Sequence, residues 1–309
     1  MTLPMVSVVI PNYNHGRFLK QRMDSIVRQT YENFEVIILD DFSSDNSREV
    51  IAGYAGDPHI REIVLNDKNS GSPFKQWQRG TDLARGEWVW LAESDDYADE
   101  RFLETMISAL ENQHHVGLVY CDSKIVSGNT VSSETFATLK NATHKTTRWN
   151  ENYVNNGLDE IENYILPYGT INNASAVLFN RSVLRDANPF DINLKYIGDK
   201  YAFIKVLARS DVAYVRESLN YYRDPFNTRH ADKLLLYFYE QFLIFNWVYR
   251  NLEQLNKVKF FNAFYQNTRC SMYRNWNKEK RMIFRDLFSV NAGLFWKCIF
   301  YNLKQPFFG

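Results

Sequence analysis

The stretch EWVWLAESDD, residues 87–96, turns from apolar to acidic in a single step. Its first half is apolar on both faces of an extended chain, which is typical of a strand in a parallel sheet that helices cover on both sides. Its second half places three carboxylates, on Glu93, Asp95 and Asp96, within four positions. Because neighbouring carboxylates repel one another, the stretch predicts a buried strand whose end faces a cation or hydrogen-bond donors.

Other short apolar runs share the character of this strand and alternate with segments of helical period. These runs are VSVVI (6–10), FEVIIL (34–39), EIVL (62–65) and GLVYC (117–121). Between the first two runs, Leu19, Met23 and Ile26 form a helical stripe. Strands that alternate with helices predict an α/β fold with a doubly wound, mostly parallel, Rossmann-like central sheet. In such a sheet, ligands bind at the carboxyl ends of the strands.

Polar side chains converge on that edge from three strand ends, at residues 11–14, 40–45 and 93–96. The loop after the first strand, PNYNHGRF, has a single glycine where a dinucleotide-binding loop needs GxGxxG, and the sequence contains no GxxxxGK[ST] motif. A divalent cation, Mg²⁺ or Mn²⁺, can replace a glycine cradle by bridging one or two carboxylates and the phosphates of a substrate. The acid-x-acid triplet at 93–95 therefore predicts a metal held open to a diphosphate.

The second half of the chain is less regular. Polar sequence rich in Thr and Asn fills 122–172, apart from a predicted short helix at LDEIENYIL. The run ASAVLFN (174–180) predicts a strand, 200–207 predicts a helix, and VAYV and LNYYR predict further strands. Beyond Pro225, LLLYFYEQFLIFNWVY (234–249) predicts a long aromatic-rich helix, and more helical sequence follows it to the C-terminal region.

The charge of the whole chain balances, because Lys+Arg and Asp+Glu both number 36, which argues against a general nucleic-acid binder. The distribution is uneven, since residues 250–309 hold eleven Lys/Arg against three Asp/Glu, a local balance of +8. The three cysteines have no CxxC spacing, which favours a reducing compartment over a disulfide framework or a zinc cluster. With no secretory signal and no apolar run of about 18 residues, we expect a cytoplasmic protein.

Several motifs occur in an order and at a spacing that resemble the family 2 inverting glycosyltransferases, which have the GT-A fold. These motifs are VSVVIPNYN (6–14), SIVRQTYENFEVIILDDFSSDNS (25–47), NSG (69–71), ESDD (93–96) and IGDKY (197–201). The resemblance extends from about residue 5 to about residue 225. It implies a nucleotide-sugar-binding half at 1–115, an acceptor-binding half at 116–228 and an aromatic-rich, basic helical region at 229–309.

The resemblance implies a nucleotide site on the strand ends. Pro11 and Tyr13 would line the pocket of the base, with Tyr13 against the face of a pyrimidine, and Asp41 would accept its N3 proton. An aromatic face and a carboxylate suit these contacts physically. Glu93 stands where the family usually has an aspartate near the ribose, and its side chain is longer by one methylene; Ser94, next to it, would also contact the nucleotide.

The same resemblance implies the catalytic machinery. Asp95 falls on the metal-ligating acid, so Mn²⁺ or Mg²⁺ is the implied cofactor. Asp199 matches the catalytic base, which the family places at the start of a helix in the second half, and would take the proton from the acceptor hydroxyl. Arg223 and His230 lie on a loosely matched segment that could fold over the phosphates.

These roles together imply an inverting, metal-dependent hexosyltransferase. It would move a sugar from a nucleotide-sugar donor, a UDP-sugar, to a hydroxyl of a saccharide or lipid-linked saccharide acceptor in surface polysaccharide biosynthesis. One alternative is a glycoside hydrolase, which also uses two carboxylates but needs no diphosphate site. Another is a non-catalytic subunit that binds a nucleotide or sugar within a polysaccharide assembly complex. Asp95, Asp96, Asp99 and Asp199 could also act as plain helix N-caps, and we expect this role for Asp99.

The C-terminal aromatic residues allow three interpretations. Phe238, Phe242, Phe245 and Tyr249 are spaced by three or four residues, so they could cap the catalytic domain or form the seam of a homodimer. The last stretch, LFWKCIFYNLKQPFFG (294–309), combines aromatic residues with lysines. Such composition also suits a helix on an anionic membrane surface, which would make the protein peripheral on the inner face of the cytoplasmic membrane.

Overall fold

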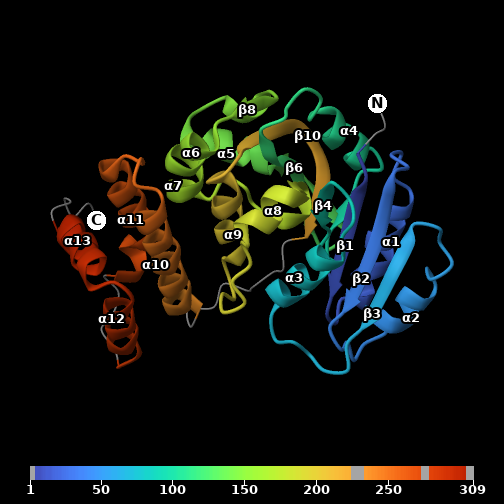
Figure 1. Cartoon of the computed structure of the whole chain (residues 1–309), viewed down its shortest axis with the longest axis horizontal. Coiled ribbons are helices and arrows are strands. Elements are labelled where there is room, and N and C mark those ends of the chain that lie inside the picture. Colours follow the sequence, from blue (N-terminus) through green and yellow to red (C-terminus); the bar gives the residue numbers. More distant parts are fainter. Residues whose placement is uncertain (1–3, 224–232, 273–277, 304–309) are drawn as a thin grey trace. The chain divides into compact units, whose positions relative to one another are not determined.

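The computed structural model describes residues 4–223, 233–272 and 278–303 (Figure 1). The chain divides into two compact units. The first comprises Met1–Gly157 and Ile171–Phe226, and the second comprises Leu158–Thr170 and Asn227–Gly309. The predicted short helix that begins at Leu158 therefore belongs to the same unit as the C-terminal helices, from which it is far removed in sequence.

The described part of the first unit is built on a ten-stranded sheet in the order β3-β2-β1-β4-β9-β6-β10-β5, with β7 beside β6 and β8 beside β10. The strands are β1 (Val6–Asn12), β2 (Phe34–Asp40), β3 (Ile60–Leu65), β4 (Trp88–Leu91), β5 (Tyr97–Ala98), β6 (Val116–Ser127), β7 (Thr130–Thr135), β8 (Tyr153–Asn155), β9 (Val177–Asn180) and β10 (Asp211–Arg223). Strand β1 pairs in parallel with β2 and β4, and β2 pairs in parallel with β3. Strand β9 runs antiparallel to both its neighbours, β4 and β6. The predicted α/β fold with a large central sheet is confirmed. The sheet is mixed rather than mostly parallel, because β10 pairs in parallel with β6 whereas β5, β7, β8 and β9 pair antiparallel with their neighbours.

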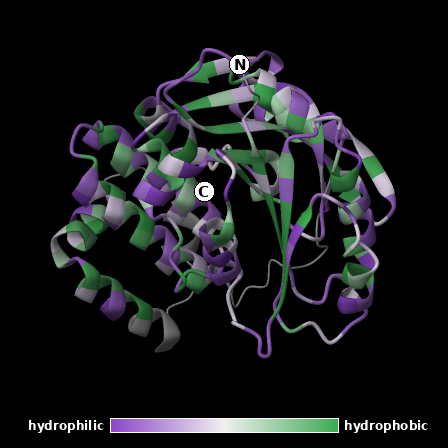
Figure 2. Ribbon diagram, turned by 45° about the vertical axis from the view of Figure 1, so that its right-hand side comes forward, coloured by the Kyte–Doolittle hydropathy of each residue, from purple (hydrophilic) through white to green (hydrophobic). Residues whose placement is uncertain are grey.

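Helices pack on both faces of this sheet, and its strands β1, β2 and β4 are buried along their whole length. Figure 2 shows green, hydrophobic segments along several strands. On one face, Val8 and Ile10 of β1 share a buried cluster with the predicted stripe on α1 (Gly16–Val27). On the other face, α3 (Pro73–Leu83) lies so close that a Cβ on Gly80 would be 2.2 Å from Val9 Cγ1. Full burial of an apolar side chain of this kind contributes about 1.5–3 kcal/mol, so β1 is held firmly at the centre of the sheet.

The other helices that lie wholly within the first unit, among the described residues, are short. They are α2 (Ser47–Ala52), α4 (Phe102–Ser108), α5 (Phe136–His144), α8 (Arg181–Ala187) and α9 (Gly198–Leu207). The expected N-cap role of Asp99 is wrong, because the N-cap of α4 is Arg101, which makes no side-chain cap bond. Asp99 Oδ1 instead accepts from the backbone N–H of Arg101 (3.0 Å) in the turn that leads into the helix.

The loops that follow β1 and β2 are hydrogen-bonded to each other. The backbone N–H of Asn14 donates to Ser43 Oγ (2.9 Å), and that of Gly16 donates to Asp45 Oδ2 (2.8 Å). The second bond gives α1 an N-terminal cap from a neighbouring loop. Asn14 and Phe42 adopt left-handed φ angles of 56° and 66°. Asparagine tolerates this conformation, whereas the Cβ of phenylalanine makes it costly.

The second unit is helical and has an aromatic core of its own. It contains α10 (Lys233–Asn251), α11 (Lys257–Met272), α12 (Lys278–Val290) and α13 (Ala292–Leu303), together with α7 (Leu166–Tyr168), and α6 (Gly157–Glu160) and a π turn (Ile161–Ile165) lead into α7. Phe242 and Phe245 of α10 are fully buried, and the ring of Phe245 lies 5.2 Å from those of Phe260 and Phe264 on α11. The aromatic side chains that the sequence places along the helix at 234–249 therefore pack inside their own unit. Among the described residues, none of the helices combines the length and apolar character that crossing a membrane requires.

Phe42 provides a test of the loop conformation. We expect Phe42→Val to lower the free energy of unfolding by about 1–2 kcal/mol, because a β-branched side chain fits a φ of 66° even less well. Phe42→Gly should leave it unchanged or raise it. Urea denaturation of the purified protein measures both, with Leu65→Val on β3, another exposed site, as the control. Equal stability of the valine and glycine variants would show that the loop does not hold this conformation.

Candidate active site

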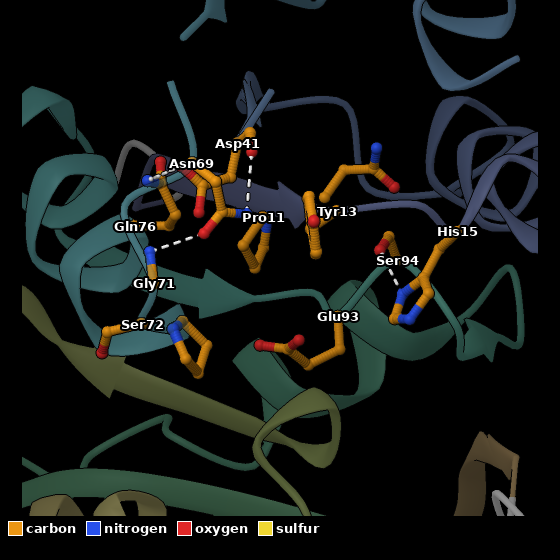
Figure 3. Close-up of a pocket in the computed structure, with 12 residues that line it drawn as sticks. Pro11, Tyr13, His15, Asp41, Asn69, Gly71, Ser72, Gln76, Glu93 and Ser94 are labelled. Carbon is orange, nitrogen blue, oxygen red and sulfur yellow. Dashed lines mark hydrogen bonds between the residues drawn. The ribbon is translucent and has the colours of Figure 1, made fainter. Parts of the chain in front are cut away.

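A cavity of about 370 Å³ lies at the carboxyl ends of β1, β2 and β4, beside the start of α3 (Figure 3). Its lining includes five of the residues that the sequence assigned to nucleotide binding, namely Pro11, Tyr13, Asp41, Glu93 and Ser94. The other residues that line it are Asn12, His15, Asn69, Gly71, Ser72, Pro73 and Gln76. The three strand ends and the NSG motif at 69–71 thus meet around one space, as their positions in a parallel sheet predict.

Asp41 ties the end of β2 to the loop that precedes α3. Its Oδ1 accepts from Asn66 Nδ2 (2.7 Å), from the backbone N–H of Ser70 (2.9 Å) and from Gln76 Nε2 (2.9 Å). Its Oδ2 accepts only from Ser70 Oγ, at 2.7 Å, among the described residues. A carboxylate offers about four acceptor positions, so Oδ2 keeps one for a ligand. Asp41 therefore shapes one wall of the cavity, and its carboxylate can accept one further hydrogen bond.

The floor of the cavity is rigid and one wall is aromatic. Pro11 is buried, whereas the ring of Tyr13 is 48% exposed and available for stacking. Asn12 holds the strand end beneath them by donating to Asp40 Oδ1 (2.9 Å) and Ser43 Oγ (3.1 Å). The first strand end therefore presents a flat aromatic surface on a fixed backbone.

Glu93 and Asp95 differ in their partners. Glu93 lines the cavity, and its Oε1 accepts from the indole Nε1 of Trp77 at 2.6 Å, so the longer side chain reaches α3. Burial and the nearby charge of Asp95 raise the pKa of Glu93 to about 8. The carboxylate of Asp95 is partly exposed and makes no hydrogen bond or ion pair among the described residues. Asp95 therefore offers oxygen ligands that no protein group occupies.

Asp96 is a buried structural carboxylate. Its Oδ1 accepts from the backbone N–H of Arg223 at 2.9 Å, and its side chain also bonds with Ser175. Burial, with the repulsion from Asp95, raises the pKa of Asp96 to about 7. A cation bound nearby would favour the ionised form of these acids and lower their pKa values.

The protein cation beneath this acidic loop is Arg22 of α1, which the sequence analysis did not single out. Arg22 is fully buried, its Nε donates to the carbonyl of Glu93 at 2.8 Å, and its guanidinium lies over the ring of Trp90. Both terminal nitrogens are without a hydrogen-bond partner among the described residues. Burial lowers the pKa of Arg22 to about 10, and the charges of Asp96 and Asp95 limit that fall. The repulsion between the acids is thus offset by a buried positive charge.

Arg223 closes the acidic loop from the side of β10. Its guanidinium donates to the carbonyl of Asp95 and to Gln21 Oε1, and it lies over the rings of Phe18 (4.6 Å) and Tyr97 (4.8 Å). These contacts fix Arg223 against α1 and β5. The predicted phosphate contact of Arg223 stays a prediction, and His230 lies outside the described residues.

Asp199 does not line the cavity. It is in the first turn of α9, and its Oδ1 accepts from the backbone N–H of Lys200 at 2.7 Å. The start of α9 packs tightly on α3, because a Cβ on Gly198 would be 2.4 Å from a ring atom of Phe74. Phe74 adjoins Pro73, which lines the cavity. The helix start that carries Asp199 thus packs on a residue next to the lining of the cavity, and the catalytic role of Asp199 stays a prediction.

His15 is a further residue of the site that the sequence analysis did not assign. It lines the cavity, and its Nδ1 lies 2.9 Å from Ser94 Oγ. The pair joins the loop after β1 to the acidic loop after β4. The only sequence feature that could have indicated this role is the position of His15 in PNYNHGRF, just after a strand end. That feature is weak, because a single histidine in a loop has many ordinary roles.

Residues 7–182 match the family model described as glycosyl transferase family 2. The chain belongs to this family. The resemblance inferred from the sequence motifs is therefore confirmed.

Curated relatives share shorter segments with the chain. The chain is 33% identical over 126 residues to glycosyltransferase GlyG of Streptococcus pneumoniae, which covers 40% of this chain and 38% of that protein. It is 29% identical over 132 residues to the poly(ribitol-phosphate) beta-N-acetylglucosaminyltransferase TarS of Staphylococcus aureus, which covers 42% of this chain and 23% of TarS. The matched segment thus spans well under half of either relative.

Solved structures share the fold along most of the chain. The structure of residues 1–349 of S. aureus TarS with UDP-GlcNAc superposes with a TM-score of 0.70 at 16% identity, covering 96% of this chain and 88% of that one. The mannosyltransferase PcManGT from Pyrobaculum calidifontis, in complex with GDP-Man and Mn²⁺, gives a TM-score of 0.60 at 15% identity, covering 98% and 88% of the two chains. The predicted GT-A fold with a helical C-terminal region is confirmed.

The role of Arg22 can be tested by stability. We expect Arg22→Met to lower the free energy of unfolding by about 3 kcal/mol, because it keeps the volume of the side chain but leaves buried Asp96 without its nearest positive charge. Urea denaturation measures the change. Lys20→Met, an exposed site on the same helix, is the control, and Arg22→Lys should recover part of the loss. An Arg22→Met variant as stable as the control would show that the acids do not depend on this guanidinium.

Proposed function

We propose that the chain is an inverting glycosyltransferase that moves a sugar from a UDP-sugar to a hydroxyl of a saccharide or lipid-linked saccharide acceptor. One observation carries the proposal. A single cavity at three parallel strand ends combines an exposed aromatic ring with a carboxylate that has one acceptor position left, and Asp95, whose carboxylate is open, directly follows the lining residues Glu93 and Ser94 in the chain. These are the groups that a pyrimidine base and a metal-bound diphosphate require. Family membership and the UDP-GlcNAc complex of TarS support this assignment.

The nucleotide would be held by groups that the fold has already positioned. The base would stack on Tyr13 above Pro11 and donate its N3–H to Asp41 Oδ2. Glu93 and Ser94 would face the ribose. Because Trp77 and His15 already bind these two side chains, little conformational entropy would be lost when the nucleotide enters.

The residues present fit a divalent cation. Among the described residues, His, Cys, Asp and Glu form no cluster of three that could hold a metal by themselves. Asp95 offers an open carboxylate, and Mg²⁺ and Mn²⁺ commonly bind one or two carboxylates and take substrate phosphates as further ligands. Asp95 would therefore hold the ion together with the diphosphate of the donor. When bound, the ion supplies positive charge that stabilises the diphosphate as it leaves.

Asp199 would act as the general base. It would take the proton from the acceptor hydroxyl while that oxygen bonds to the anomeric carbon, on the face opposite the departing diphosphate. The bond between the anomeric carbon and the diphosphate breaks, and the configuration at the carbon inverts. The packing of Gly198 on Phe74, next to the lining residue Pro73, supports this proposal because it joins the start of α9 to the helix beside the cavity.

We also propose that the acceptor belongs to a surface polysaccharide. Support comes from the similarity to TarS, a poly(ribitol-phosphate) beta-N-acetylglucosaminyltransferase, which is 29% identical to this chain over 132 residues. The donor sugar, the acceptor and the linkage would depend on the loops at about residues 122–172, whose sequence has no pattern that indicates a specificity.

The donor site predicts metal-dependent nucleotide binding. In calorimetric titrations, UDP should bind in the presence of Mn²⁺, and Asp95→Ala should weaken that binding by about 100-fold, since even losing an outer partner of a metal ligand costs 10–100-fold. Asp82→Ala, an exposed site on α3, should bind like the parent protein. If UDP binds equally well to Asp95→Ala, Asp95 is not the metal ligand.

The base assignment predicts a loss of turnover without a loss of donor binding. Asp199→Asn should lower kcat by about 10²–10⁴, because an amide cannot take the proton, and should leave UDP affinity unchanged. Transfer from UDP-sugars is measured by UDP release, with Asp186→Asn on α8 as the control. Undiminished transfer by Asp199→Asn would refute the assignment. A parent protein that binds UDP but transfers nothing would indicate a non-catalytic binding subunit.

A further inference from the structure

The two C-terminal helices carry a second apolar surface besides the one they bury. Leu287 of α12 and Leu294 and Cys298 of α13 are at most 1% exposed and face the core of the second unit. On another side of the same helices, the side chains of Phe288, Trp296 and Phe300 are 45%, 48% and 59% exposed. A helix that is apolar on more than one side needs a second apolar environment. The exposed surface is therefore not explained by the packing of the unit.

The three exposed rings form one continuous patch, which we call the aromatic face. The centroid of Trp296 lies 6.4 Å from that of Phe288 and 5.8 Å from that of Phe300. Scattered apolar side chains are normal on a soluble protein, whereas a contiguous group of large rings marks a surface that something covers. The aromatic face is thus a candidate for docking.

The sequence of these two helices is rich in basic residues. Residues 278–304 carry six Lys/Arg against two Asp/Glu, a balance of +4 within the +8 of residues 250–309. Arg285 precedes Phe288 by one helical turn, and its side chain is 76% exposed. Lys297 is exposed next to Trp296, and its Nζ donates to Tyr249 OH at 2.7 Å. The partner must therefore tolerate apolar rings and supply negative charge.

We infer that the aromatic face docks on an anionic lipid bilayer. Tryptophan and phenylalanine rings insert at the boundary between headgroups and acyl chains, while lysine and arginine bind the anionic headgroups around them. A second copy of this chain fits less well, because an interface through this face would bring two basic surfaces together. The inference does not depend on the proposed transfer reaction, since the aromatic face lies in the second unit and the donor cavity in the first.

Flotation of the purified full chain with lipid vesicles tests the inference. The protein should float with vesicles that contain phosphatidylglycerol, should not float with phosphatidylcholine alone, and should release as salt concentration rises. Trp296→Ser combined with Phe300→Ser should weaken binding by about tenfold or more, because both rings leave the lipid boundary. Val258→Ser, a change at a 62% exposed apolar side chain on α11, should bind as the parent does.

A charge variant and an oligomer measurement complete the test. Arg285→Gln combined with Lys297→Gln keeps the aromatic rings and should reduce binding to phosphatidylglycerol vesicles. This second variant tests the inference even if the serine variant does not fold. Failure of the parent protein to float, or equal binding by the parent and both double variants, would overturn the inference. A dimer in light scattering that the serine variant abolishes, without vesicle binding, would assign the aromatic face to self-association.

Discussion

The parallel pairing of β1 with both β2 and β4 is the constraint on which the candidate site depends. Parallel strands end at the same edge of a sheet, so the loops after these three strands have to meet there. The pairing is secured because β1 is buried along its whole length, between α1 on one face and α3 on the other. The cavity is a consequence of this arrangement, and its position does not depend on any single side chain within it.

The acidic loop after β4 shows how the fold stabilises a feature that would otherwise be unfavourable. Three groups offset the repulsion among the carboxylates of this loop. Arg22 of α1 donates to the carbonyl of Glu93, the indole of Trp77 on α3 donates to the Glu93 carboxylate, and the backbone N–H of Arg223 on β10 donates to Asp96. Each compensating group binds a different part of the loop. Asp95 is the acid that none of them neutralises by a hydrogen bond or ion pair among the described residues, which leaves its carboxylate open to an external cation.

The two units use aromatic residues in different ways. In the first unit, one exposed ring, Tyr13, faces a polar cavity and suits a single flat ligand. In the second unit, aromatic side chains such as Phe242 and Phe245 build the core itself, and further rings remain exposed on α12 and α13. The single exposed ring of Tyr13 suits a small ligand such as the proposed nucleotide. The larger group of exposed rings on α12 and α13 suits a broad surface such as the proposed lipid bilayer.

The sequence by itself determined the class of fold, the edge of the sheet where the site lies and five of the twelve residues that line the cavity. These follow from local patterns: apolar runs, helical stripes and polar residues directly after strands. The sequence could not assign Arg22 to the site. Its position beside the Leu19–Met23–Ile26 stripe indicated that it could be buried, but whether a charged side chain is buried depends on which distant segments pack over it. Nor could it show that Gln76, Asn66 and Ser70 all donate to Asp41, or that 158–170 joins the C-terminal helices. Only the tertiary structure decided these points, because hydrogen bonds and charge pairs between distant segments depend on distances in space that no local pattern encodes.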